Sequence, residues 1–549
     1  MRALSHIISR FRADRRGNIA VIFTLALFPI MAAVGCVIDY SMASRIKAKL
    51  QSAADAASVA AIAQKSPGYI AAAKMTVDGA VADAVADAYK VLDGNMTSVT
   101  GYTNLLRTGT VTKTGIRLTS RIDFSADVPV NFLGVLRAFG LNGYQNIRVG
   151  GSASSSASLP PYLDFYLLLD VSGSMGLPST TDEAKRLQSL NPDNWVQYRT
   201  GCTLACHFAP LKSACVDPPV TSPAAPAANP SINSSYTQQY NTNNACMGYA
   251  YSRVSPSDLS ALINLASSAT YPKQVPGLPK QMLSSLPGSL NTDAKFGLPA
   301  VASCPKDGTD DCIQLRLDAV GSAVNELLAT AKTSAKVTNQ FRIGLYPFIT
   351  DIDENYAPLT ASIDGNASTP GTINYAATKL AMQLDTNLNA TLGSGGTHID
   401  YALNSLNGLI RTVGDGSAST NTKPFVFLVT DGAQDNQYKD VPNGSWHGSN
   451  HATVLSDTGN DYPSICKTLT DRGIIVSVLY IPYQQINPVN TTFAGNEDTY
   501  ANNNIANIPD SLKTCASPGF YYTANKPADI TAALNAMFSQ SLVTAHITD

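Results

Sequence analysis

The stretch Leu163-Asp-Phe-Tyr-Leu-Leu-Leu-Asp170-Val-Ser172-Gly-Ser174 decides the fold of this chain. Its first seven residues are almost uninterruptedly apolar, which predicts a strand buried on both faces of a parallel sheet. The run stops at Asp170, and the pattern Asp-x-Ser-x-Ser then places one carboxylate and two hydroxyls on a tight turn. These hard oxygen ligands suit a small divalent cation such as Mg²⁺.

Two later segments add oxygen ligands of the same kind. Ser394-Gly-Gly-Thr397 precedes a helical pattern at Ile399–Ile410, and Phe425–Thr430 is a second buried strand that ends in Asp431. Because ligands of open α/β sheets bind outside the carboxyl ends of the strands, we expect these loops to meet at one edge.

The other segments after Pro161 alternate between helical and strand periodicity, which favours an α/β fold with a doubly wound, mostly parallel sheet. The predicted elements are a helix from Ile313, strand Phe341–Phe348, helix Tyr375–Leu388, helix Pro463–Asp471, strand Ile474–Ile481, strand Phe520–Thr523 and helix Ala528–Leu542.

This constellation resembles the metal-ion-dependent adhesion site of von Willebrand factor A domains. The family pattern of Asp-x-Ser-x-Ser, then a Thr, then an Asp matches at Asp170, Ser172, Ser174, Thr397 and Asp431, with no ligand position substituted. The resemblance implies a site for Mg²⁺, or for Mn²⁺ or Ca²⁺. It also implies an adhesion-type mechanism, in which an acidic group of a partner protein completes the cation's shell.

An insertion of about 135 residues, 177–311, separates the metal loop from the first helix of this domain. Six cysteines lie in it or at its end: Cys202, Cys206, Cys215, Cys246, Cys304 and Cys312. We expect disulfides with unknown pairing, since an irregular segment needs cross-links. A zinc site at Cys202, Cys206, His207 and Cys215 is an alternative, whereas c-type haem requires Cys-x-x-Cys-His, one residue shorter than the spacing here.

Cys466 and Cys515 remain outside the insertion and are predicted to pair with each other. Each precedes a predicted strand, and adjacent parallel elements can bring two Cα atoms within disulfide distance. Two free thiols are the alternative.

Composition limits the classes of function. The chain has 549 residues, a formal net charge of −2 and 14% charged residues, so no overall attraction to nucleic acid is expected. Eight of the nine cysteines follow one membrane-like segment, which indicates an oxidising compartment.

That segment, Ile19–Ile38, is a charge-free run of twenty residues, long enough to span a bilayer. Five arginines precede it, so the positive-inside rule predicts a cytoplasmic basic segment (1–17), a single spanning helix (18–38) and a periplasmic remainder. The alternatives for this segment are a cleaved secretory signal, lipidation of Cys36, and a twin-arginine signal at Arg15-Arg16.

Residues 39–158 are predicted to form a membrane-proximal region of Ala-rich helices and a small β module. We expect one helix over 39–66, a break at Pro67-Gly68 and a second helix near Tyr69–Val91. Period-2 alternation then predicts strands within 95–157, with a short helix after Val128–Leu133 and a closing strand Ile147–Val149. The Gly/Ser/Ala-rich segment Gly150–Ser158 is predicted to be a flexible join to the A-type domain, 159–549.

A stripe of small residues on the first helix, comprising Ala53, Ala56, Ala57, Ala60 and Ala61, allows close helix approach. It packs either on its own domain or on a partner helix.

A second resemblance covers nearly the whole chain. Arg15-Arg-Gly-Asn-Ile-Ala20, a spanning helix, Asp39-Tyr40 and Leu50-Gln-Ser-Ala-Ala-Asp-Ala-Ala57 are similar to TadG-like proteins of tight-adherence (Flp pilus) assembly. Those proteins carry an N-terminal anchor, an Ala-rich helix and a small β region before a C-terminal A domain. Pilins have a Glu five residues after the cleaved Gly, but Ile22 stands there, which favours a retained anchor.

Other candidate sites are weaker. His447 and His451 lie in a segment of loop composition without the Glu and helix of zinc proteases, and Asp351-Ile-Asp353-Glu354 fits either a solvated loop or a calcium site. No nucleophile–base pair or phosphate loop is evident, so we expect a binding protein rather than an enzyme.

The sequence thus predicts an inner-membrane-anchored, metal-dependent protein-binding component of Flp pilus assembly. Its expected partners are pilins or other assembly components, and no nucleic acid. The alternatives are a surface adhesin or sensor, and an A-domain subunit of a chelatase-like enzyme complex, which the anchor and cysteines disfavour.

Overall fold

The computed structural model describes residues 18–132, 145–183, 304, 306–308, 314–363, 367–384, 391–393, 396–439, 445–455, 465–485 and 496–547. The chain divides into two compact units, Met1–Pro160 with Lys336–Thr338, and Pro161–Ala335 with Asn339–Asp549.

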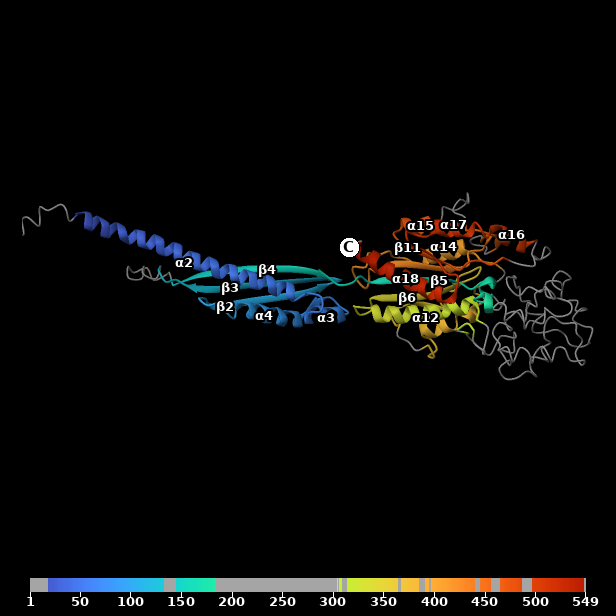
Figure 1. Cartoon of the computed structure of the whole chain (residues 1–549), viewed down its shortest axis with the longest axis horizontal. Helices are drawn as coiled ribbons and strands as arrows, with labels where there is room; N and C mark the ends of the chain where they lie inside the picture. The colour runs from blue at the N-terminus through green and yellow to red at the C-terminus, as the bar shows by residue number, and fades with distance from the viewer. Residues whose placement is uncertain are drawn as a thin grey trace, which may run out of the picture. The chain divides into compact units, whose positions relative to one another are not determined.

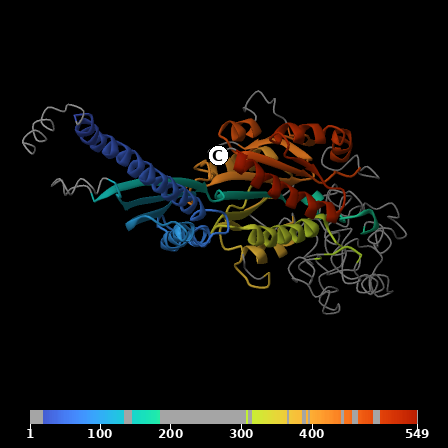
Figure 2. The ribbon, with the colours of Figure 1, turned by 60° about the vertical axis from the view of Figure 1, so that its left-hand side comes forward.

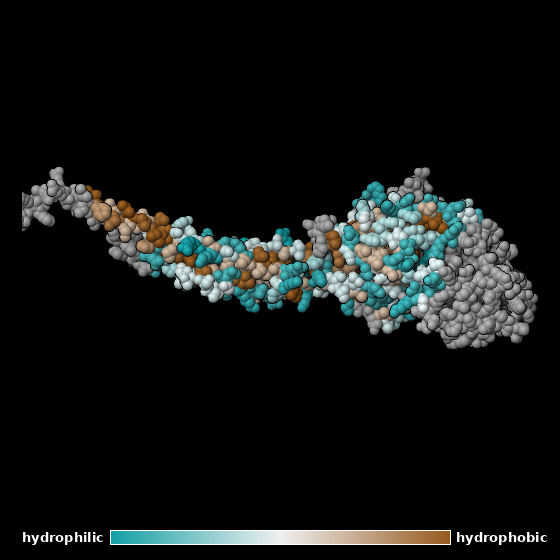
Figure 3. Space-filling model, viewed as in Figure 1, coloured by the Kyte–Doolittle hydropathy of each residue, from teal (hydrophilic) through white to brown (hydrophobic). Residues whose placement is uncertain are grey.

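The first unit begins with one long helix, α2 (Asn18–Ala60), which runs over the predicted spanning segment and out of it (Figure 1). Large apolar side chains in its first half are exposed, among them Phe23, Leu25 and Val37, and they form a brown band in Figure 3. Its second half is different, because Leu50, Ala54 and Ala57 are fully buried within this unit. The small-residue stripe therefore packs at least partly on its own domain.

A four-stranded antiparallel sheet follows, in the order β1-β2-β3-β4. Its strands are β1 (Gly79–Ala80), β2 (Thr103–Thr114), β3 (Arg117–Pro129) and β4 (Asn146–Ser158). Buried and less buried residues alternate along β3, as the period-2 pattern predicted. The helix expected over Tyr69–Val91 is instead two helices, α3 (Pro67–Lys74) and α4 (Ala82–Met96), separated by β1.

The prediction of a flexible join at Gly150–Ser158 is wrong, because this segment forms most of β4. The small residues serve close packing: a Cβ at Gly151 would lie 2.5 Å from Gln51 Oε1 and 2.8 Å from Phe124 Cζ. Helix α2 lies against this strand, with Gln51 Nε2 donating to Ser152 O at 3.0 Å. In this segment, a composition that is typical of linkers allows a strand to pack closely against a helix. The short helix expected after Val128–Leu133 falls outside the described residues.

The second unit is built on a six-stranded sheet in the order β12-β11-β8-β5-β6-β7. All neighbouring pairs are parallel except β6 and β7. The strands are β5 (Leu163–Asp170), β6 (Phe341–Phe348), β7 (Ala357–Thr360), β8 (Lys423–Thr430), β11 (Ile475–Tyr480) and β12 (Tyr521–Thr523). The predicted α/β architecture with a mostly parallel sheet is therefore present.

Helices cover both faces of this sheet (Figures 1 and 2). One face carries α12 (Arg316–Ser334), α13 (Ile373–Thr378) and α18 (Pro527–Ile547). The other carries α14 (Ile399–Leu409), α15 (Ile465–Asp471) and α17 (Ile508–Cys515). Alternate residues of the all-apolar strands feed two separate cores, which explains the continuous hydrophobic runs.

Phe165 of β5 is the centre of the first core. Its ring lies 5.1–6.1 Å from the rings of four others, namely Phe341, Phe425, Phe427 and Phe538. These distances are typical of favourable aromatic pairs. The cluster fixes β5 against β6 and β8, so the ends of these strands are held in a rigid register.

Several elements were not predicted. After Asp431 the chain forms a two-stranded hairpin, β9 (Gln434–Lys439) and β10 (Trp446–Thr453), and α16 (Glu497–Asn504) precedes α17. Polar, Asn-rich segments such as these lack the hydrophobic period on which prediction depends. The described part of the helix expected over Tyr375–Leu388 consists of α13 and a 3₁₀ turn, η5 (Leu380–Gln383), and residues 385–388 lie outside the described residues.

Candidate metal centre

Asp170 and Asp431 end up at the same edge of the sheet. Asp170 is the last residue of β5, Asp431 directly follows β8, and the two strands are parallel neighbours with Leu169 opposite Val429. Both carboxylates are buried, with 1% and 0% of the residue exposed. The register of two apolar strands thus brings together two acidic residues that are 261 positions apart in the sequence.

The loop after β5 places the two predicted hydroxyls beside Asp170. The Ser172 backbone N–H donates to Asp170 Oδ1 at 2.9 Å, and Ser172 Oγ lies 3.3 Å from Ser174 Oγ. A short 3₁₀ turn, η3 (Gly173–Gly176), continues the loop, and the fully buried side chains of Val171 and Met175 hold it to the core. The serine oxygens therefore stand on a rigid turn.

Thr430, which sequence reasoning missed, holds the second oxygen of Asp170. Its Oγ1 donates to Asp170 Oδ2 at 2.6 Å and accepts a hydrogen bond from Gly432 N at 2.9 Å. This hydroxyl ties the end of β5 to the loop after β8. A Thr immediately before the strand-end Asp was the available signal.

Arg316 is the second missed residue and the first residue of α12. Its Nη1 lies 3.3 Å from Asp431 Oδ2 in a salt bridge whose side chains are 3% and 0% exposed. Its Nη2 donates to Pro482 O at 3.2 Å, just beyond β11. The guanidinium thus joins the loops after β8 and β11. An Arg at a helix N-terminus is electrostatically unfavourable, and that anomaly was the signal in the sequence.

Thr397 lies at the same edge as the two carboxylates. Its carbonyl accepts from Asp435 N at 2.9 Å, and the adjacent His398 N donates to Ile349 O, just beyond β6, at 2.9 Å. The segment before α14 is therefore fixed between the loop after β6 and strand β9, with Thr397 8% exposed. A Cβ at Gly396 would lie 2.1 Å from Asp435 Oδ2, so a larger residue there would displace the Asp435 carboxylate. Ser394 and Gly395 lie outside the described residues.

Gly432 and a disulfide support the Asp431 loop from behind. Gly432 has φ +80°, and a Cβ there would lie 2.4 Å from Ile508 Cγ2 of α17. Helix α17 is joined to α15 by the disulfide Cys466–Cys515, with a Cα–Cα distance of 5.0 Å. This is the pair that the sequence predicts.

The electrostatics of the site favour a cation. Burial, and then the nearby carboxylate of Asp431, raise the pKa of Asp170 to about 7. When both are ionised, two carboxylates face the single positive charge of Arg316, which leaves a formal charge of −1. The donor set of carboxylates and hydroxyls consists of hard oxygen ligands, as Mg²⁺ requires, so the residues fit such an ion. No three His, Cys, Asp or Glu side chains gather around a metal position in the described ranges.

The other candidate residues are placed as follows. His447 and His451 lie in β10 and not in a loop, as their composition had indicated. Asp353 Oδ1 accepts from Asn355 N at 3.0 Å in a turn after β6. Cys304 is buried and disulfide-bonded. Cys202, Cys206, His207, Cys215, Cys246 and Cys312 lie outside the described residues.

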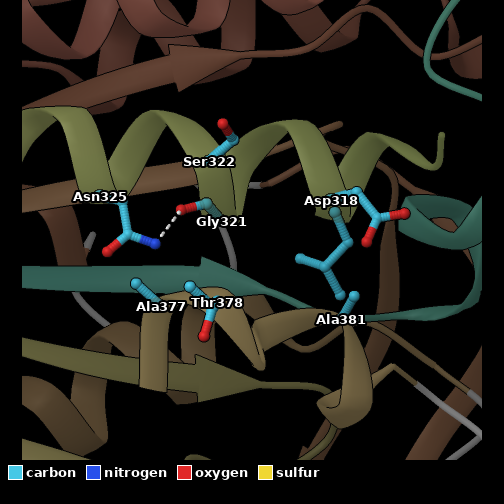
Figure 4. Close-up of a pocket in the computed structure, with 8 residues that line it drawn as sticks. Asp318, Gly321, Ser322, Asn325, Ala377, Thr378 and Ala381 are labelled. Carbon is cyan, nitrogen blue, oxygen red and sulfur yellow. Dashed lines mark hydrogen bonds between the residues drawn. The ribbon is translucent and has the colours of Figure 1, made fainter. Parts of the chain in front are cut away.

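A separate hollow lies between α12, α13 and η5 (Figure 4). A Cβ at Gly321 would lie 2.6 Å from Ala377 O, so glycine permits this close helix approach. Asn325 Nδ2 donates to Gly321 O at 3.4 Å. None of the predicted metal ligands lines it.

Comparison with known families identifies the N-terminal part of the chain. Residues 17–86 match the family described as Flp pilus-assembly TadE/G-like. This chain carries a TadE/G-like region. The region comprises all of α2 and α3 and the start of α4, and the sequence resemblance that predicted it began at Arg15. None of the curated proteins matches the sequence.

Solved structures with some likeness include three pilus proteins. The pilus adhesin SpaC from Lactobacillus rhamnosus GG is 12% identical, with a TM-score of 0.29 over 80% of this chain and 34% of SpaC. The vWF domain of the type V pili tip protein Mfa5 from Porphyromonas gingivalis is 12% identical, with a TM-score of 0.26 over 42% and 89% of the respective chains.

The PilB minor pilin from Streptococcus sanguinis is 10% identical, with a TM-score of 0.28 over 80% of this chain and 78% of PilB. This chain thus spans about a third of the length of SpaC.

Proposed function

We propose that this protein is a membrane-anchored, periplasmic component of Flp (tight-adherence) pilus assembly. In this proposal its second unit is a von Willebrand factor A-type domain that binds a partner protein through a divalent cation. The observation that carries the proposal is the buried oxygen site at the ends of β5 and β8, in a chain with a TadE/G-like region.

Asp170, Ser172, Ser174, Thr397 and Asp431 would hold the cation, with Mg²⁺ as the first candidate and Mn²⁺ or Ca²⁺ as alternatives. The bound ion would supply a positive charge that an acidic side chain of a pilin or another assembly component completes. The chain's own residues fix the carboxylates in advance, through Thr430, Arg316 and the Ser172 backbone. We propose a binding role and not a catalytic one.

Calorimetry tests the cation site on the full chain, purified in detergent and stripped with a chelator. The wild type should bind Mg²⁺ and Mn²⁺. Asp170→Asn and Thr397→Val should each weaken binding at least about tenfold. Asp353→Asn is the matched control, because it removes an Asp near another strand end, and it should leave binding unchanged. Equal binding by the wild type and Asp170→Asn would rule out the site.

The proposed topology rests on helix α2. In the described residues one helix, Leu25–Ala60, is long and apolar enough to cross a membrane. Exposed apolar side chains in its first half would then face lipid, and the disulfide Cys466–Cys515 is consistent with an oxidising compartment. Protease treatment of spheroplasts should degrade a C-terminal epitope, and a protected epitope would contradict this topology. An N-terminal epitope retained on the membrane-bound chain would exclude cleavage of a signal.

The partner can be sought by cross-linking in cells that make Flp pili. Pilins or other assembly components should be captured by the wild type in Mg²⁺, and lost with a chelator or in Asp170→Asn. Capture that is independent of both would show that binding does not pass through the metal site.

A further inference from the structure

The salt bridge between Arg316 and Asp431 lies inside the candidate metal centre. Arg316 Nη1 is 3.3 Å from Oδ2 of Asp431, whose carboxylate is one of the proposed ligands of the cation. Both side chains are almost completely buried, at 3% and 0% exposure, so water does not screen their interaction. The guanidinium is therefore a permanent positive charge next to the position of a second one.

Helix formation does not explain an arginine at this position. Arg316 is the first residue of α12, where the helix dipole disfavours a positive charge. The helix start is served by Asp318 instead, whose Oδ2 accepts from Leu315 N at 3.0 Å. Burying an arginine also has a large desolvation cost, which in this structure is offset by Asp431 and the carbonyl of Pro482. Arg316 is therefore unfavourable both for the helix dipole and for desolvation, and its contact with the metal-site carboxylate offsets these costs.

We propose that Arg316 is a resident counter-charge of the site, which holds Asp431 in place without metal and lowers the affinity for the divalent cation. The inference rests on the proposed cation site. In the metal-free protein, the guanidinium offsets part of the repulsion between two buried carboxylates. When a cation enters, it shares Asp431 with Arg316 and is repelled by it. The residue thus keeps the site folded at low metal concentration and sets a threshold for occupancy.

The experiment compares substitutions at Arg316 with one at Arg342, in the full chain in detergent after chelator treatment. Arg342 pairs with Asp164 at the opposite end of β5, with Nη2–Oδ2 at 2.6 Å, so Arg342→Gln removes an Asp–Arg pair without touching the site. Arg316→Gln removes the charge, Arg316→Lys keeps it, and Arg316→Met is the replacement if the Gln variant does not fold. Mg²⁺ and Mn²⁺ affinities are measured by calorimetry, and thermal unfolding is followed with and without metal.

Arg316→Gln is expected to bind Mg²⁺ about tenfold more tightly than the wild type, a gain of about 1.4 kcal/mol. Without metal, Arg316→Gln should also unfold at a lower temperature than the wild type. Saturating Mg²⁺ should then raise its unfolding temperature by more than it raises that of the wild type. Arg316→Lys should stay within about threefold of the wild-type affinity, because the positive charge remains. Arg342→Gln should leave the affinity unchanged.

Arg316→Gln, or Arg316→Met in its place, with an affinity equal to or weaker than that of the wild type would overturn the inference. If the wild type binds the cation and Asp170→Asn does not, the proposed function remains supported even when the inference about Arg316 is wrong. If neither the wild type nor any Arg316 variant binds a cation, both proposals fall.

Discussion

Strand β5 has a buried aspartate near each end, and the two aspartates have different charged partners. At the start of the strand, Asp164 receives two hydrogen bonds from Arg342, at 2.7 and 2.6 Å, and one from Thr422 Oγ1 at 2.5 Å. At the end, Asp170 and Asp431 lie together, and the salt bridge goes from Arg316 to Asp431. The first end is a closed pair with balanced charge, while the second has one more carboxylate than guanidinium.

The arginines at the two ends of β5 also differ in their exposure to solvent. Arg342 is 39% exposed, so water can take over part of the role of its partner, whereas Arg316 is 3% exposed. The comparison shows how one strand can carry a structural ion pair and a site with capacity for a further cation. Both ends use Asp and Arg, so the difference between them comes from burial and from the number of charged groups.

The largest effect is expected from Asp431→Ala, which leaves the buried Arg316 without its carboxylate. Breaking a buried ion pair in this way costs about 3–5 kcal/mol of unfolding free energy. Asp164→Ala should cost less, because the half-exposed Arg342 can turn to water. Urea unfolding followed by circular dichroism, with chelator present, measures both. Equal losses for Asp431→Ala and Asp164→Ala would contradict the expectation that the burial of the arginine partner determines the loss.

Loss of the disulfide Cys466–Cys515 should affect the Asp431 end more than the Asp164 end, because α17 packs behind Gly432. For a sequence separation of 49 the chain-entropy model gives about 4 kcal/mol, and strain reduces it. In the double Cys→Ser variant, amide exchange should rise in peptides containing Gly432 and stay low in those containing Asp164. A uniform rise would contradict this. Peptide mapping after alkylation checks the pairing, and linkage of either cysteine to the insertion would refute it.

Gly432→Ala should cause the next largest loss of stability, and Gly519→Ala is its control. Both glycines have positive φ, +80° and +82°, but a Cβ at Gly519 meets nothing within 4 Å. The shared backbone strain costs about 1–2 kcal/mol, and crowding against Ile508 should add about 1–3 kcal/mol at Gly432 alone. Only Gly432→Ala should also weaken Mg²⁺ binding. Equal stability of the two variants would show that α17 can move away.

The smallest effect is expected from Arg342→Gln, because Arg342 is 39% exposed and Thr422 Oγ1 still donates to Asp164 after the change. We expect a loss of less than about 1 kcal/mol in urea unfolding. A loss as large as that of Asp431→Ala would mean that exposure does not separate the two ends.

Much of this arrangement could be predicted from the sequence, for identifiable reasons. The apolar runs Leu163–Leu169 and Phe425–Val429 are typical of buried strands, and their ends bring Asp170 and Asp431 together once the strands pair in parallel. Arg316 could not be placed in this way, since its contact with Asp431 spans 115 residues and follows no local period.

The errors elsewhere have a similar cause. Gly150–Ser158 was predicted to be a linker because its composition is that of one, but tertiary packing against α2 makes it a strand. The polar hairpin after Asp431 has no hydrophobic alternation to detect. Composition indicated the local tendency in each case, and contacts distant in sequence overrode it.

A crystal structure of the protein grown with Mn²⁺ tests the central claim most directly, because the anomalous signal of manganese locates the ion without reference to its ligands. We predict a peak at the edge of the sheet beyond β5 and β8, within coordination distance of oxygens from Asp170, Ser172 and Ser174. The peak should be lost in crystals of Asp170→Asn and kept in Asp353→Asn. No peak at this edge in Mn²⁺-saturated crystals, or one that persists in Asp170→Asn, would contradict the account.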